Sequence, residues 1–183
     1  MQQSDDREPK PRWTSVPDSP AQDSLADLFT RYHHEVFRLC LGMLGERQEA
    51  EDATQEVFLR AQRGWAGYNP QLAAPRTWLG HISINYCRSL LRRRQIWQQI
   101  QRIVAPVAPQ HIHQREAKLD MLAALHQLDT IHRGVILLRY YLDLSCSDIA
   151  HVLDIPEGTV RSRLSYARRK LRNYLEGDQH DTK

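Results

Sequence analysis

The chain has 183 residues, 26% of them charged, and a formal net charge of +3. This length suits two small domains. No run of about 20 apolar residues marks a membrane span, and the first residues lack the apolar core of a secretory signal, so we expect a cytoplasmic protein. The three cysteines are far apart and odd in number, which favours free thiols over a disulfide framework or a metal site.

Charge is segregated along the chain. Residues 46–56 have a net charge of −4, whereas residues 76–103 carry +6 and residues 156–172 carry +5. Two basic segments separated by a linker predict two contacts with one polyanion, such as a nucleic acid.

Helical periodicity dominates the first half of the chain. Residues 1–22 are polar and rich in proline, and we expect them to form a disordered tail. Over residues 24–45 apolar side chains, Phe29 among them, recur at three- and four-residue steps and predict a helix. A second helix is expected over 48–63. A loop rich in glycine and proline follows it, and a third helix is predicted from Pro75 through the arginine triplet beyond it.

The second half contains a linker and further helices. Prolines between residues 104 and 113 favour extended backbone, and helices are expected over 114–128 and 130–142. No segment alternates with a two-residue period, so we predict an all-α fold of two small helical domains joined by a flexible linker. The predicted units are a tail (1–22), a first domain (23–95), a linker (96–113), a second domain (114–176) and a tail (177–183).

The segment 144–172 has the signals of a helix-turn-helix. Ser145 and Asp148 have the spacing of a capping box, Asp154 suits a tight turn, and Pro156 is expected to open the final helix. An α-helix fits the major groove of DNA, and a recognition helix reads base edges mainly with its amino-terminal residues. If the final helix enters the groove in this way, the expected base-reading residues are Arg161, Ser162, Ser165 and Tyr166. The alternative is that the basic face of this helix is merely solvated.

The string Gly158-Thr159-Val160-Arg161-Ser162-Arg163-Leu164 resembles the minus-35 recognition helix of extracytoplasmic-function sigma factors. The resemblance extends over residues 24–175 and implies a subunit of RNA polymerase that binds promoter DNA. The implied minus-35 contacts are Thr159, Arg161, Ser162, Arg163, Ser165, Tyr166 and Arg169.

The first domain carries the rest of the resemblance. The segment 49–61 is similar to the part of a sigma factor that docks on core polymerase, and its acidic side chains would complement a basic partner. The third helix and the loop before it resemble the minus-10 element, where aromatic faces stack on unpaired bases and arginines follow the phosphates. The implied contacts are Asp52, Gln55, Glu56 and Leu59 for the polymerase, and Trp65, Tyr68, Asn69, Asn85, Arg88, Arg92 and Arg93 for the minus-10 DNA.

Other classes of protein fit the sequence less well. No phosphate-binding loop, nucleophile elbow or zinc-ligand motif occurs, so we expect no enzyme, no cofactor and no metal. By resemblance the partners are core RNA polymerase, promoter DNA and an anti-sigma factor. Leu128-Asp129 departs from the family, in which Leu-Pro often begins a helix. The competing interpretation is an autonomous helix-turn-helix regulator that binds DNA as a dimer, which leaves the acidic face of the first domain unexplained.

Overall fold

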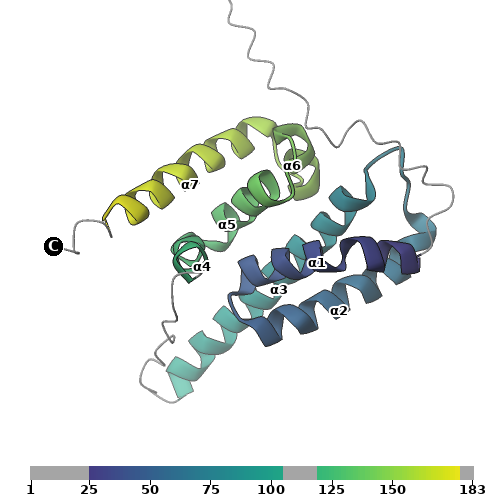
Figure 1. Ribbon diagram of the computed structural model, residues 1–183. Coiled ribbons are helices and arrows are strands. Elements are labelled where there is room, and N and C mark those ends of the chain that lie inside the picture. The colour runs from purple at the N-terminus through teal and green to yellow at the C-terminus, as the bar shows by residue number, and fades with distance from the viewer. Residues whose placement is uncertain (1–24, 105–118, 178–183) are drawn as a thin grey trace, which may run out of the picture.

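The computed structural model describes residues 25–104 and 119–177, and both ranges are helical, without a strand. The predicted all-α fold is confirmed, while the tail 1–22, residues 105–113 of the linker and the tail from 178 lie outside the described residues. Figure 1 shows α1–α3 as one group and α4–α7 as a second, with α5 between α7 and the first group. The elements are α1 (Leu25–Leu44), α2 (Arg47–Gly64), the short 3-10 turn η2 (Trp65–Gly67), α3 (Pro75–Val104), α4 (Leu119–His126), α5 (Thr130–Ile136), the π-helical turn η3 (Leu137–Tyr141), α6 (Cys146–Leu153) and α7 (Glu157–Gly177).

Small side chains bring α1 and α2 together. The predicted inner face of α2 is confirmed, because Ala50, Ala53, Val57 and Ala61 are all at most 1% exposed. Gly45 ends α1 with a φ of +83°, a left-handed conformation that a residue without Cβ adopts at little cost. The chain therefore reverses within two residues and lays α2 against α1.

Local signals also shape the helix-turn-helix. The Ser145 side chain accepts a hydrogen bond from the Asp148 N–H, and the Asp148 carboxylate accepts one from the Ser145 N–H, so the predicted capping box is confirmed. Asp154 is left-handed with a φ of 51°, as the predicted tight turn requires. Pro156 was predicted to open the final helix, but it lies one residue before α7. Its carbonyl accepts hydrogen bonds from the N–H groups of the first turn of α7.

The helix predicted over 130–142 is divided in the structure. It begins after Asp129, whose carboxylate accepts hydrogen bonds from the next turn, so the aspartate supplies a cap where the family often has proline. Regular α-helix ends at Ile136, and a π-helical turn follows through Tyr141. Such turns insert an extra residue into the helical ladder and widen it locally.

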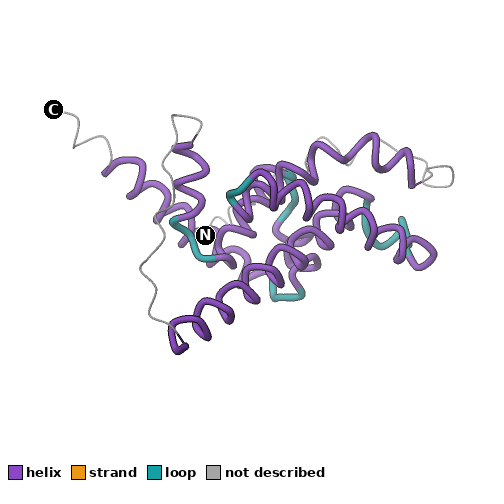
Figure 2. Tube along the Cα trace, turned by 90° about the horizontal axis from the view of Figure 1, so that it is seen from below, coloured by secondary structure: helices purple, strands orange, loops and turns teal. Residues whose placement is uncertain are grey.

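The long helix α3 is buried on two sides. The side predicted from periodicity, with Trp78 and Tyr86, packs against the core of the first group. Ile84 and Gly80 lie on another side, where Ile84 is fully buried near Gly134 and Gly80 approaches Leu142. One continuous hydrophobic core therefore runs through both helical groups. Figure 2 shows the far end of α3 projecting beyond this core.

The cysteines are free, as predicted, with Cys40 and Cys87 buried and Cys146 partly exposed. A hydrogen bond between Cys40 and Cys87, together with burial, raises the pKa of the Cys87 thiol. The Cys87 thiol is therefore protonated at neutral pH, and both buried cysteines belong to the hydrophobic core. None of the described helices is both long and apolar enough to cross a membrane.

The capping box gives a stability prediction. Replacing Ser145 with alanine should lower the free energy of unfolding by about 1 kcal/mol, because the first turn of α6 loses a cap. Urea denaturation measures the change. Ser147→Ala is the matched control, since Ser147 is exposed and makes no cap. Equal losses in the two variants would contradict the assigned role of Ser145.

Candidate nucleic-acid interface

Buried residues fix which face of α7 is presented outward. Val160, Leu164 and Ala167 are at most 5% exposed and pack against the rest of the second helical group, as the periodicity predicted. Helix α7 lies on the outer side of that group, away from α1–α3 (Figure 1). The remaining predicted residues of α7 therefore share an accessible basic surface. Arg161, Ser162, Ser165, Tyr166 and Arg169 are exposed, while Thr159 and Arg163 are half-buried.

Two predicted base-reading residues already have partners within the chain. The Arg161 guanidinium donates to the Glu157 carboxylate at 2.6 Å, and this hydrogen bond raises the pKa of Arg161. The Ser162 hydroxyl donates to the Thr159 carbonyl at 2.9 Å. Because both partners lie on α7, any nucleic acid that recruits Arg161 competes with a carboxylate one turn away.

Tyr166 is held by a residue that sequence reasoning missed. The Tyr166 ring lies 4.5 Å from the His132 ring, measured between centroids. His132 comes from α5, and its Nδ1 lies 2.7 Å from the Asp129 carboxylate. The Arg169 guanidinium lies 5.7 Å from the centroid of the Tyr166 ring. The pattern of α7 alone gave no sign of this contact, because His132 belongs to another helix.

The outward face of α2 matches its prediction. Asp52, Gln55 and Leu59 are exposed, and Leu59 is a bare apolar side chain at 46% exposure. Glu56 is half-buried and bonded to Arg60 at 2.8 Å.

This surface continues onto α1 through one residue that was expected inside. Phe29 belongs to the apolar periodicity of α1, yet it is 45% exposed. Its ring packs edge-on against Phe58, with centroids 4.8 Å apart, and Phe58 precedes Leu59 in the chain. An exposed apolar surface that spans two helices is suited to protein contact.

The loop between α2 and α3 is internally packed. Trp65 and Tyr68 stack with ring centroids 5.3 Å apart, and Tyr68 lies 4.7 Å from the half-buried Trp78. The Tyr68 hydroxyl donates to the Ala73 carbonyl, and the Asn69 side chain accepts from the Gln71 N–H. The three loop residues predicted to capture a base therefore lie together in one ordered turn, with part of their aromatic surface already covered.

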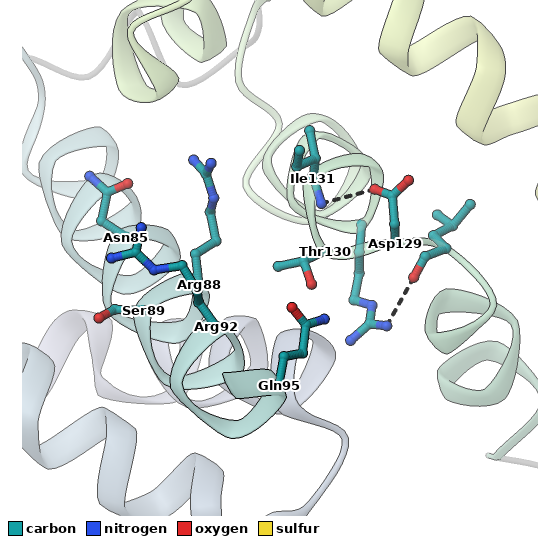
Figure 3. A pocket seen from close by; sticks show the side chains of 10 residues that line it. Asn85, Arg88, Ser89, Arg92, Gln95, Asp129, Thr130 and Ile131 are labelled. Carbon is teal, nitrogen blue, oxygen red and sulfur yellow. Dashed lines mark hydrogen bonds between the residues drawn. The ribbon is translucent and has the colours of Figure 1, made fainter. Parts of the chain in front are cut away.

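The basic side of α3 faces the second helical group across an open cavity of about 690 Å³. Of the residues predicted on this helix, Asn85, Arg88 and Arg92 line the cavity, and Arg93 does not. The opposite wall is the start of α5, with Asp129 and its neighbours (Figure 3). The lining residues from α3 are Asn85, Arg88, Ser89, Arg92 and Gln95.

A buried arginine ties the two helical groups together. Arg133 is 7% exposed, and its guanidinium donates to three carbonyls near the end of α4 and, at 2.6 Å, to the Met43 carbonyl of α1. Beside it His126 contacts Gly45, and the His126 Nε2 atom is buried without a hydrogen-bond partner. Burial, with a smaller effect of the Arg133 charge, lowers the pKa of His126 to about 4.

An outward basic helix, positioned by a capped helix and a tight turn, defines a DNA-binding protein of the helix-turn-helix class. Two family models extend this description. Sigma-70 region 2 matches residues 28–96, and Sigma-70 region 4 matches residues 124–173.

Curated relatives agree with the family models. The chain is 30% identical over 169 residues to the ECF RNA polymerase sigma factor SigW of Bacillus subtilis, covering 84% of this chain and 90% of that one. It is 31% identical over 173 residues to the ECF RNA polymerase sigma factor SigE of Mycolicibacterium smegmatis, covering 90% of this chain and 66% of that one. The chain therefore belongs to the ECF RNA polymerase sigma factors of the sigma-70 family. The relatives are sigma factors, which are not an enzyme family.

Solved structures share the fold. The sigma factor RpoE of Bartonella quintana, solved with the anti-sigma factor NepR, has a TM-score of 0.71 at 22% identity, over 88% of this chain and 98% of that one. CnrH, solved with the cytosolic domain of CnrY, has a TM-score of 0.66 at 24% identity, over 87% of this chain and 92% of that one.

The lowered pKa of His126 gives a pH prediction. The unfolded chain takes up this proton near the ordinary pKa of 6.5, whereas the folded chain resists it down to about 4. The contribution of His126 to stability should therefore be lost as the pH drops from 6.5 towards 4 and change no further below that. Burial lowers the pKa of His81 too, so His81 also contributes to the loss of stability at low pH.

Urea unfolding at pH 7.5 and pH 5 measures this loss. His126→Gln should shrink the difference between the two values, and His34→Gln, at an exposed position of α1, should leave it unchanged. An undiminished loss in His126→Gln would contradict the assignment.

Proposed function

We propose that this chain directs initiation from a specific promoter set by binding core polymerase through α2 and promoter DNA through α3, its preceding loop and α7. It catalyses nothing itself, and the polymerase carries out the phosphoryl transfer. It acts in the cytoplasm, where the polymerase works. The observation that carries the proposal is the separation of two unlike surfaces, an acidic and apolar face on α2 and a basic face on α7, within one sigma-family fold.

Each surface has the chemistry that its assigned partner requires. Arginines on α7 and α3 neutralise phosphates and so supply most of the affinity for DNA, while base edges in the major groove supply specificity. On α2, carboxylates steer a basic partner and the exposed Leu59 adds apolar contact. The competing interpretation, an autonomous dimeric regulator, does not explain the acidic and apolar face of α2.

Regulation by an anti-sigma factor belongs to the same proposal. The two solved relatives are in complexes, RpoE with the anti-sigma factor NepR and CnrH with the cytosolic domain of CnrY. The similar overall fold supports the inference that a partner of that class holds this chain inactive.

Binding to core polymerase tests the proposal and the α2 face together. The purified chain should form a 1:1 complex with core polymerase, which a dimeric regulator would not. Asp52→Arg combined with Gln55→Ala should weaken that complex at least about tenfold, or roughly 1.4 kcal/mol, because both side chains point outward.

The control for this experiment is a matched pair of changes on the last turns of α7. Glu176→Arg with Asn173→Ala alters two exposed residues in the same way and should leave polymerase binding unchanged. Circular dichroism should show unchanged helix content in both double variants. Failure of the wild-type chain to bind core polymerase would refute the proposed function.

The two ends of α7 should respond differently to loss of an arginine. Arg161→Ala should change which minus-35 sequences are used, because a bidentate contact to guanine near the helix start discriminates by about 1–3 kcal/mol. Arg172→Ala, about three turns later, should weaken all sequences alike and lower the salt slope by about one unit, as a phosphate contact does.

Transcription from a minus-35 library at two salt concentrations separates these effects. Arg172 serves as the control for Arg161, since both are exposed arginines of one helix. An unchanged sequence profile for Arg161→Ala would place base recognition elsewhere on α7.

A further inference from the structure

We propose that the carboxyl end of α3 is a second reading surface for double-stranded DNA, which recognises an A·T pair in the spacer directly upstream of the minus-10 element through Gln95, Ile96 and Gln99. The inference rests on the proposed function, because it takes α3 to lie on minus-10 DNA. It adds three residues and a new segment of the promoter to the contacts predicted for α3.

A stripe of amide and guanidinium side chains runs along one side of α3. Residues at alternating steps of three and four share one side of an α-helix, and this spacing joins Asn85, Arg88, Arg92, Gln95 and Gln99. Figure 3 shows the first four on the side of α3 that lines the open cavity. The residues predicted to bind minus-10 DNA therefore begin a polar surface that continues beyond them.

The stripe extends past the protein core. All residues from 92 to 99 are exposed, and α3 continues to Val104 as a projecting helix (Figure 2). The Arg94 guanidinium donates to the Glu49 carboxylate of α2 at 3.4 Å. At about 100° per residue, Arg92 and Gln99 lie roughly 150° around the helix from Arg94. The contact with α2 therefore leaves this part of the stripe turned away from α2 and open to a partner.

Charge decides which kind of partner fits this surface. Residues 76–103 include six arginines and no acidic residue, so the helix suits a polyanion. A projecting helix without bulky neighbours also has the shape that the major groove of duplex DNA admits. The acidic and apolar face of α2 is the surface proposed for polymerase, and the α3 stripe has the opposite charge. Duplex DNA is therefore the partner that this end of α3 fits best.

The side chains of the stripe select an A·T pair. Glutamine pairs with adenine through two hydrogen bonds, to N6 and N7 in the major groove, and an apolar side chain contacts the methyl group of thymine. Gln95 and Gln99 supply the amides, and Ile96, which is 49% exposed, lies between them on the same side of the helix. Two kinds of side chain on one surface therefore favour the same base pair.

The order of the elements gives the direction along the promoter. Region 4, proposed to bind the minus-35 element, follows α3 in the chain, so the carboxyl end of α3 points upstream. At 1.5 Å per residue, Gln95 and Gln99 lie about 5 Å and 10 Å beyond Arg92, which corresponds to about one to three base pairs. The A·T pair should therefore lie within about three base pairs of the minus-10 element.

Transcription from a promoter library tests this inference. The library randomises the spacer next to the minus-10 element and is transcribed by the full chain assembled with core polymerase. The parent chain should favour A·T at one position by at least about fivefold, the lower end of what one bidentate contact provides. Gln99→Ala should remove most of that preference, and it should fold normally because alanine favours the helix.

A change of preference is a sharper test than its loss. Gln99→Glu should move the preference from A·T to C·G at the same position, because a carboxylate accepts a hydrogen bond from cytosine N4. Gln98→Ala is the matched control, since Gln98 is an exposed glutamine about 100° around the helix from Gln99. It should keep the profile of the parent chain.

Three results would overturn the inference. One is a parent profile without a preference next to the minus-10 element, and another is the same profile for Gln99→Ala and Gln98→Ala. The third is weaker binding of Gln99→Ala to core polymerase, which would assign the surface to the polymerase. Failure of the proposed function gives a different result, the absence of any complex between the parent chain and core polymerase.

Discussion

Arg133 is the interaction on which the arrangement of the two regions depends. A guanidinium that is 7% exposed has lost most of its hydration, a cost of several kcal/mol unless its donors find partners. Four backbone carbonyls are the partners of the Arg133 guanidinium, and no carboxylate is among its hydrogen-bond partners. Because three of those carbonyls lie in the last turns of α1 and α4, one side chain sets the position of α4 and its distance from α1.

Helix α3 converts that position into a functional arrangement. Its amino-terminal half has one side in the core of region 2 and another against region 4, while Arg88 and Arg92 line the cavity between the two regions. The residues of α3 predicted to bind minus-10 DNA and the side of α3 that faces region 4 therefore belong to the same part of one helix.

Sequence reasoning succeeded where the cause is local. Helix caps at Ser145 and the left-handed Asp154 depend on neighbours within a few residues, and the inner face of α2 follows from periodicity. The position of Gly80 in the sequence did not predict its contact with region 4, because Leu142, which it approaches, is about 60 residues later in the chain. The sequence did not predict the burial of Arg133 either, since arginine in a helix is ordinarily exposed.

The candidate site divides in the same way. The exposure of the predicted α2 and α7 residues followed from helical geometry, and the structure agrees with it. Predicting the contact between His132 and Tyr166 would require knowing how α5 packs on α7. Predicting the exposure of Phe29 would require knowing the direction of α1 relative to α2. Which of these residues touch DNA or polymerase stays a prediction.

Asp129 lies between residues that are predicted to serve two different promoter elements. Its carboxylate caps α5 and bonds His132, whose ring packs against Tyr166, a residue predicted to read the minus-35 element. Asp129 also lines the cavity that holds Arg88 and Arg92, which are predicted to bind minus-10 DNA. A proline, frequent at this place in the family, would have no carboxylate for either purpose. One ordinary helix cap thus links residues predicted to read the upstream element to residues predicted to meet the downstream one. We therefore expect a substitution at Asp129 to change both preferences together, so that the two halves of a promoter would not evolve independently for this chain.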